Sequence, residues 1–396
     1  MNNHNGPVLR KQLDSFIRKR KCTLLAVGPV SVNCADAAIE LSNEHEFPMM
    51  LIASRRQVDS SKHGGGYVNG WTTSEFSKYV KTKDKSGSVY LARDHGGPWQ
   101  NTIESERNFS LEEAMESAKE SYRADIDAGF SFLHIDPSID IHGIPSTDVI
   151  LNRVFDLYEF CAEYALEKNR EIIFEVGTEE QNGGLNTIEV LQYLLDEINL
   201  FCQKKNYALP MFVVVQTGTR VMETRNTGSL EHSIRENVSD AEIRSRIPEL
   251  VDICGRSGLQ IKAHNADYLS SEAIRLHPEL GIQAANVAPE FGVTETRALL
   301  QLLEHYSMNH LSERFLELSY QSKKWKKWML EDTKATDHER AIISGHYVFS
   351  TTECAEIKSE ADQLLGNKGI ILDQFLKEKV KKQMLRYVQG FNLISN

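Results

Sequence analysis

The sequence predicts an α/β protein, a (β/α)8 barrel with a helical C-terminal extension, from three observations. Short apolar segments alternate with longer amphipathic ones, which is typical of parallel strands that helices cover on both faces. Eight such strands fall within about 290 residues, and a barrel of this class usually takes about 250. The remaining C-terminal part of the chain is helical and charged in pattern.

The predicted strands are short, nearly continuous apolar runs. A doubly wound open sheet would also alternate strands with helices, but the first strand lacks the G-x-G-x-x-G turn that is typical of many such folds. The pattern therefore favours the barrel. The eight expected strands are Thr23–Val27, Met49–Ala53, Val89–Ala92, Phe132–Ile135, Ile172–Val176, Met211–Val215, Leu259–Ala263 and Ile282–Val287.

Helix signals lie between these strands. The segment "SLEEAMESAKESYRADIDAG" begins with Ser110 as a predicted N-cap, has Glu113 three residues later, and ends at Gly129. Beyond Tyr306 the pattern is helical and charged, so we expect a barrel domain of residues 1–306 and a helical extension of residues 307–396. Such an extension would cover one end of the barrel or form an oligomer interface.

Charge and cysteine content exclude some classes of protein. A net charge of −11 and a pI near 5.7 argue against a general nucleic-acid binder. The short basic runs "RKRK" (18–21) and "KKWKK" (323–327) are interpreted as solvated faces. The six cysteines contain no C-x-x-C pair, which is typical of a reducing compartment. With no signal-peptide pattern and no apolar run of about 18–20 residues, we expect a cytoplasmic protein outside membranes.

Polar side chains stand at the carboxyl ends of the predicted strands, where barrels of this class carry their active sites. A single strand-end carboxylate is more often a helix N-cap, and His134 between apolar neighbours is equally well explained as a structural histidine. Their convergence at one end is what favours a site. The strand-end groups are Arg55, Arg56, Gln57, Asp94, His95, His134, Asp136, Glu175, Glu179, Glu180, Gln216, His264, Asn265, Asp267 and Asn286.

The residue types indicate metal-assisted chemistry. His95 and His264, from separate strands and with carboxylates nearby, are a suitable ligand pair for a divalent metal, with zinc the first choice. Such a metal polarises a substrate carbonyl and stabilises an enediolate, while a carboxylate moves the proton. Aldol cleavage, aldose–ketose isomerisation and epimerisation all use this combination. A metal-free pocket that only binds a sugar is the alternative.

Several local signatures occur in one order along residues 50–300. "DHGGP" (94–98) and "AHNADY" (263–268) are similar to D-H-L-G-P and A-H-S-T-D-Y, and "AGFSFLHIDPS" to A-G-F-x-x-I-H-L-D-x-S. "QVDSSKHGGGYVNGWT", "VGTEEQNGG" and "VVQTG" resemble three further motifs of the same set. On these motifs the chain resembles the GatZ/KbaZ family, described as the non-catalytic subunit of class II D-tagatose-1,6-bisphosphate aldolase.

The resemblance implies a TIM barrel related to the zinc-dependent class II aldolases. In those relatives, an Asp-His pair follows strand three, and histidines follow strands six and seven. Asp94-His95 and His264 match the first and last places, while Gln216 stands at the strand-six place, as in GatZ/KbaZ proteins. An amide oxygen is a weak zinc ligand, so Glu179 or Glu175 would have to replace the missing imidazole. Some proteins of this kind are described as ketose-phosphate 4-epimerases.

The resemblance leaves the phosphate site open. Class II aldolases bind a substrate phosphate through a Gly-Ser segment after strand seven, where this chain has "HNADY" without glycine. A phosphate would then lie near Thr294 and Arg297, or near Arg55 and Arg56.

These observations lead to a carbohydrate-metabolism protein of the GatZ/KbaZ type, with aldol cleavage or C4 epimerisation of a ketose or ketose phosphate as its expected chemistry. The alternative is a non-catalytic subunit that stabilises a separate class II aldolase. A homo-oligomer is expected in either case. The expected metal ligands are His95, His264 and Glu179, with Gln216 as a further candidate. The expected catalytic groups are Asp94, Asp136 and Glu179, and the expected substrate-binding groups are Gln57, Gln216, Lys262, Asp267 and Asn286.

Overall fold

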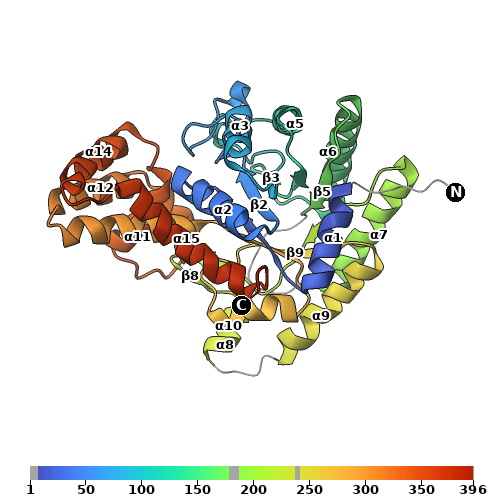
Figure 1. Ribbon diagram of the computed structural model, residues 1–396. Helices are drawn as coiled ribbons and strands as arrows, with labels where there is room; N and C mark the ends of the chain where they lie inside the picture. Colours follow the sequence, from blue (N-terminus) through green and yellow to red (C-terminus); the bar gives the residue numbers. More distant parts are fainter. Residues whose placement is uncertain (1–7, 178–186, 237–240, 396) are drawn as a thin grey trace.

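The computed structural model describes residues 8–177, 187–236 and 241–395. Among these, eight parallel strands close into a barrel in the order β1-β10-β9-β6-β5-β4-β3-β2, with helices around them (Figure 1). The predicted (β/α)8 barrel is confirmed. The barrel strands are β1 (Leu24–Val27), β2 (Met49–Ser54), β3 (Val89–Gly96), β4 (Phe132–Ile135), β5 (Ile173–Val176), β6 (Phe212–Val214), β9 (Gln260–Ala263) and β10 (Ala284–Val287).

Strand β3 runs four residues beyond the predicted end at Ala92, and this difference shapes the site. It stays paired with β2 as far as Ser54 and Asp94, but its register with β4 shifts between Arg93 and Gly96. His95 lies in this irregularity with a φ of 44°, in the left-handed region that non-glycine residues rarely adopt. Asp94 and His95 therefore belong to the strand end itself.

The helices follow the cap signals of the sequence. Ser110 and Glu113 form the predicted capping box at the start of α5, and Gly129 ends that helix with a φ of 83°. Helices of the barrel part are α1 (Val8–Arg20), α2 (Val32–His45), α3 (Thr73–Lys83), α4 (Thr102–Glu106), α5 (Leu111–Ala128), α6 (Thr147–Glu167), α7 (Ile188–Lys205), α8 (Ser229–Arg235), α9 (Ala241–Arg256), α10 (Ser271–Glu279) and α11 (Pro289–His305), with the 3-10 turn η1 (Ser61–His63).

The C-terminal part forms a lobe beside the barrel (Figure 1). It contains α12 (Asn309–Gln321), η2 (Lys324–Trp328), α13 (Asp337–Ser344), η3 (Gly345–Tyr347) and α14 (Thr352–Gly366). The long helix α15 (Leu372–Gly390) then returns to the barrel. Four of the five residues of the run "KKWKK" (323–327) belong to the 3-10 turn η2, and Lys323 directly precedes that turn.

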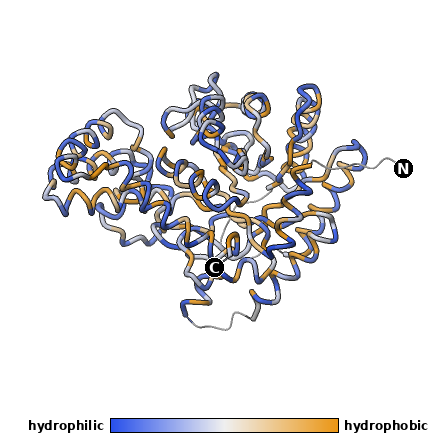
Figure 2. The backbone as a smooth tube through the Cα atoms, in the orientation of Figure 1, coloured by the Kyte–Doolittle hydropathy of each residue, from blue (hydrophilic) through white to orange (hydrophobic). Residues whose placement is uncertain are grey.

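Two hydrophobic cores hold these parts together. One fills the barrel and the space beneath its helices, and it includes Met384 and Tyr387 of α15. The other lies among α11, α12, α13 and α14 and reaches Leu376 near the start of α15. Figure 2 shows hydrophobic positions along the strands and alternating with hydrophilic ones along the helices. No helix in the described part of the chain has the length and apolar character needed to cross a membrane.

Helix α15 ties the two cores to one another. Lys377 and Lys381 form ion pairs with Glu40 and Glu44 of α2, and the Lys381–Glu44 distance is 2.5 Å. At its end, the Phe391 carbonyl accepts a hydrogen bond of 3.0 Å from the N–H of Thr23, one residue before β1. The division at Tyr306 stays a prediction, but the last helix buries most of its core side chains in the barrel core rather than in that of the lobe.

A glycine of α11 permits a close approach between barrel and lobe. A Cβ on Gly292 would lie 2.6 Å from Cβ of His346 in η3, a distance that real Cβ atoms essentially never show. Gly255 of α9, by contrast, has open space where a Cβ would be. The two helical glycines therefore form a matched pair for testing this contact.

We expect Gly292→Ala to lower the free energy of unfolding by about 1–3 kcal/mol, because the methyl group overpacks the contact with His346. Gly255→Ala should be neutral or raise it by up to about 1 kcal/mol, since alanine is the better helix former. Urea denaturation followed by circular dichroism measures both. If Gly292→Ala were at least as stable as the parent, α11 and η3 would not be in close contact at Gly292 and His346.

Candidate active site

A cavity of about 440 Å³ opens at the carboxyl ends of the barrel strands. Strand ends and the loops that follow them contribute most of its polar groups, as this class of barrel requires. The C-terminal lobe contributes the rest. From the barrel the cavity is lined by Arg56, Gln57, Tyr67, Asp94, His95, Gln100, Asp136, His264, Asp267 and Asn286, and from the lobe by Lys327, Trp328, His346 and Tyr347.

His95 is held by a carboxylate from the next strand. Its Nδ1 lies 2.6 Å from Oδ2 of Asp136, which directly follows β4. The other oxygen of Asp136 accepts a hydrogen bond of 2.6 Å from the hydroxyl of Ser138. With Nδ1 committed to Asp136, the Nε2 atom of His95 is the one available to a ligand.

His134 supports the unusual backbone of His95. Its Nδ1 accepts a hydrogen bond of 3.1 Å from the backbone N–H of His95, which the irregular strand end frees from the sheet. Its Nε2 is packed against Gly177, where a Cβ would lie only 2.4 Å away. Among the described residues this Nε2 has no hydrogen-bond partner. His134 therefore positions His95 through the main chain.

The polar groups around His264 cannot all complete their hydrogen bonds with one another. Its Nε2 lies 3.2 Å from Oε1 of Glu175 and 3.0 Å from Nδ2 of Asn286. The first contact requires a proton on this nitrogen and the second requires a lone pair. The amide of Asn286 also donates to Asp94 at 3.0 Å, while its buried oxygen has no partner in the described part of the chain. Such unsatisfied buried groups indicate a site shaped for a ligand.

The charges at the mouth are strongly coupled. Burial would raise the pKa of Asp94, but the imidazoles, above all His95, outweigh it and hold this pKa well below its usual range. Burial would lower the pKa of His95, but Asp94 and Asp136 raise it to about 9. Burial lowers the pKa of His264 to about 4, so this ring is neutral at pH 7. Without a bound metal, the mouth thus combines ionised carboxylates, one cationic imidazole and one neutral imidazole. Coordination of a metal by Nε2 of His95 would displace its proton.

The side chains present fit a divalent cation. Among the residues that the structure describes, three overlapping trios have donor atoms within 4.8 Å of one another: Asp94–His95–His264, His95–His134–Asp136 and His134–Glu175–His264. His134 is already engaged through Nδ1 and packed at Nε2, which leaves the first trio. Imidazole nitrogen and carboxylate oxygen are ligands that zinc and manganese accept.

Comparison with known proteins connects this geometry to a family. Residues 11–199 match the family described as D-tagatose-1,6-bisphosphate aldolase subunit GatZ/KbaZ-like. The resemblance to the GatZ/KbaZ family is confirmed. The matched part carries Asp94, His95 and Asp136, while His264 and Asn286 lie beyond it.

Solved structures share the fold of this chain. One is a probable tagatose 6 phosphate kinase from Sinorhizobium meliloti 1021, 16% identical, with a TM-score of 0.71 over 93% of this chain and 100% of that one. Another is the fructose-bisphosphate aldolase from Campylobacter jejuni, 11% identical, with a TM-score of 0.52 over 98% and 94% of the two chains. At these identities the likeness shows a common architecture.

Other predicted site residues have local partners. Lys262 of β9 lies 2.5 Å from Oε2 of Glu175, and both side chains are buried. One oxygen of Asp267 accepts hydrogen bonds of 2.9 Å from the N–H groups of Ala288 and Glu290, so it holds the start of α11. Burial and the neighbouring Glu290 raise the pKa of Asp267 to about 8.

The remaining predictions are placed as follows. Gln57 lines the cavity and accepts a hydrogen bond of 2.9 Å from the N–H of Ser54. Gln216 is buried after β6 and is not part of the cavity lining. Glu179, expected as metal ligand and catalytic group, lies outside the described residues. The roles assigned to all these side chains stay predictions.

Sequence reasoning missed the contribution of the lobe. Lys327 ends the run "KKWKK", which was interpreted as a solvated face, and Trp328 directly follows that run. His346 and Tyr347 had no signal of their own. The rule that strand ends carry the site does not extend to a separate helical segment. Only the packing of η2 and η3 over the mouth brings these residues to it.

The buried pair of Lys262 and Glu175 yields a stability prediction. Lys262→Met leaves the Glu175 carboxylate buried without its main counter-charge, which we expect to lower the free energy of unfolding by about 3–5 kcal/mol. Adding Glu175→Gln should restore much of this loss, because the unpaired charge is then removed. Urea denaturation of the single and double variants measures both effects.

An exposed pair serves as the control. Lys62 forms an ion pair with Glu120 while 71% of its side chain is exposed, so Lys62→Met should cost less than about 1 kcal/mol. If Lys262→Met were no more damaging than Lys62→Met, the ion pair with Glu175 would not be a buried one.

Proposed function

We propose that this protein acts on a ketose or ketose phosphate by metal-assisted aldol-type chemistry, either retro-aldol cleavage or C4 epimerisation. The observation that carries the proposal is the convergence of His95 and His264 with Asp94 in one cavity. The unsatisfied groups of Asn286 and His264 at the same point support a ligand there. The aldolase-subunit family that matches residues 11–199 supports the substrate class.

Each side chain has a proposed role. His95 and His264 hold a divalent metal, with Asp94 or Glu179 as the third donor. When bound, such a metal polarises the substrate carbonyl and stabilises an enediolate. Asp136 fixes the ring of His95, a positioning role that its bonds to His95 and Ser138 favour over the predicted acid/base role. Asn286, between Asp94 and His264, orients a substrate hydroxyl.

Proton transfer follows from this arrangement. An ionised carboxylate, Asp94 or Glu179, takes the proton of the substrate hydroxyl next to the scissile carbon–carbon bond. As the hydroxyl becomes a carbonyl, that bond breaks, and its electron pair remains on the other fragment as an enediolate. Transfer of a proton to the enediolate carbon, followed by release of both fragments, completes cleavage. Re-addition to the opposite face of the new carbonyl, with return of the proton, yields the C4 epimer.

A second function has an observation in its favour. The matching family is described as an aldolase subunit, and the strand-six place carries Gln216 where a third imidazole would be expected. Under this proposal the chain stabilises a separate class II aldolase and has no turnover of its own. Assembly as a homo-oligomer in the cytoplasm belongs to both proposals, and the free, buried state of the six cysteines agrees with a reducing compartment.

The decisive experiment compares metal content. After zinc or manganese reconstitution and dialysis, the parent protein should retain close to one equivalent of metal, and His95→Ala/His264→Ala essentially none, because two of its nitrogen donors are gone. Elemental analysis measures this, with circular dichroism to show that the variant is folded. Turnover of ketose phosphates should be lost in the double variant and in the chelator-treated parent.

His310→Ala is the matched control, since His310 lies on α12 and pairs with Glu360 on the surface of the lobe. It should keep both metal and turnover. Activity retained by His95→Ala/His264→Ala would overturn the assignment. No metal in the parent, together with a stable complex with a class II aldolase, would favour the subunit function.

A further inference from the structure

We propose that the C-terminal lobe completes the substrate site, with Lys327 and Arg56 forming an anion subsite that binds the phosphate ester of a ketose phosphate. The inference deepens the proposed function and rests on it. It adds a side chain of the lobe to the site and gives Lys327, the last residue of the basic run "KKWKK", a role.

Lys327 is held over aromatic rings at the cavity. Its Nζ lies 4.7 Å from the ring centre of Trp328 and 5.3 Å from that of Tyr347, which are cation–π distances. The indole N–H of Trp328 donates a hydrogen bond of 3.3 Å to the hydroxyl of Tyr347. The ammonium group is thus placed at the cavity by a ring pair that also lines it.

The same rings join the lobe to the segment that carries Arg56. Tyr67 packs against Tyr347 with ring centres 5.0 Å apart, and against His346 at 6.3 Å. The N–H of Tyr67 donates a hydrogen bond of 3.0 Å to the carbonyl of Arg56. Two cations from distant parts of the sequence therefore reach one cavity, linked by one aromatic cluster.

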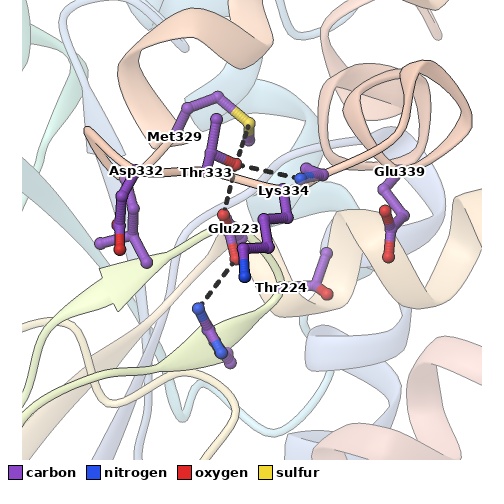
Figure 3. A pocket seen from close by; sticks show the side chains of 10 residues that line it. Glu223, Thr224, Met329, Asp332, Thr333, Lys334 and Glu339 are labelled. Atoms are coloured by element: carbon purple, nitrogen blue, oxygen red, sulfur yellow. Dashed lines mark hydrogen bonds and ion pairs between the residues drawn. The ribbon is translucent and has the colours of Figure 1, made fainter.

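A hairpin of the barrel anchors η2 from its other side. This hairpin consists of β7 (Val221–Met222) and β8 (Arg225–Asn226), and the N–H of Glu223 at its turn donates a hydrogen bond of 2.7 Å to the carbonyl of Trp328. The hydroxyl of Thr333 donates to the Glu223 carboxylate at 2.6 Å. Figure 3 shows this hydrogen bond between Thr333 and Glu223 among the side chains that line the hollow between hairpin and lobe. The two hydrogen bonds between the hairpin and the lobe fix the position of η2, and with it that of Lys327.

The charge distribution at the cavity favours such a subsite. In the described part of the chain, no carboxylate lies within ion-pair distance of Lys327 or Arg56, whereas Arg55 is buried and paired with Asp59 and Glu104. Deeper in the cavity, Asp94 and Asp136 would repel a phosphate. In a chain of net charge −11, an anionic substrate needs local cations to bind. The phosphate therefore belongs at the cationic rim, with the ketose reaching inward.

The test uses a probe that has no carbonyl and cannot react. Calorimetric titration of the full-length protein with D-glucitol 6-phosphate and with D-glucitol separates the phosphate contribution from turnover. We expect at least about tenfold tighter binding of the phosphate ester, with competition by inorganic phosphate and weakening by salt. Lys327→Met and Arg56→Met should each remove most of this preference, and Lys327→Arg should keep it.

Lys324→Met is the matched control, because Lys324 belongs to the same turn but is not part of the cavity lining. It should bind the phosphate ester like the parent. Equal affinity for ester and polyol, an unchanged Lys327→Met, or an equal loss in Lys324→Met would each overturn the subsite. If the protein preferred the phosphate ester through Lys327 but turned over no ketose phosphate, the result would count against the proposed function alone. If it showed turnover without a preference for the phosphate ester, the result would count against the subsite alone.

Discussion

The parallel pairing of β1 with β10 is the constraint on which the candidate site depends. It joins Leu24–Val27 to Ala284–Val287 residue by residue and closes the sheet. Once the sheet is closed, the carboxyl ends of all strands meet on one rim, and side chains far apart in the sequence come within contact. Asn286 of the last strand reaches Asp94 of the third for this reason.

Closure of the barrel also places many ionisable groups in a small volume where most of them are buried from solvent. The structure accommodates them by alternating charges: Asp136 faces His95, and Glu175 faces Lys262. Lysine Nζ and imidazole groups lower the pKa of Glu175 to about 2 against the opposing effect of burial, so it stays ionised. In the described part of the chain, Asn286 and His264 are among the groups without a complete set of partners, and both line the cavity.

The lobe is part of this arrangement through its contacts with the barrel. Its core continues along α11, whose first residues are held by Asp267 at the mouth. Glu290 of α11 in turn accepts hydrogen bonds from the hydroxyl of Tyr387 and the amide of Gln383, both on α15. A change in the packing of the last helix therefore reaches the start of α11 and the edge of the cavity.

The sequence by itself determined the barrel, the order of its strands and the side chains at their ends, because apolar periodicity and cap residues are local properties. It also pointed to Asp94, His95, His264 and Asn286 as neighbours, since strand ends must meet. Only the tertiary structure decided that Lys262 pairs with Glu175, that Asp267 holds α11, and that Lys327 lies at the mouth. These outcomes depend on side-chain direction and on contacts across long stretches of chain. Such contacts are determined by how the strands and helices pack once the barrel is closed, and no local sequence pattern encodes them.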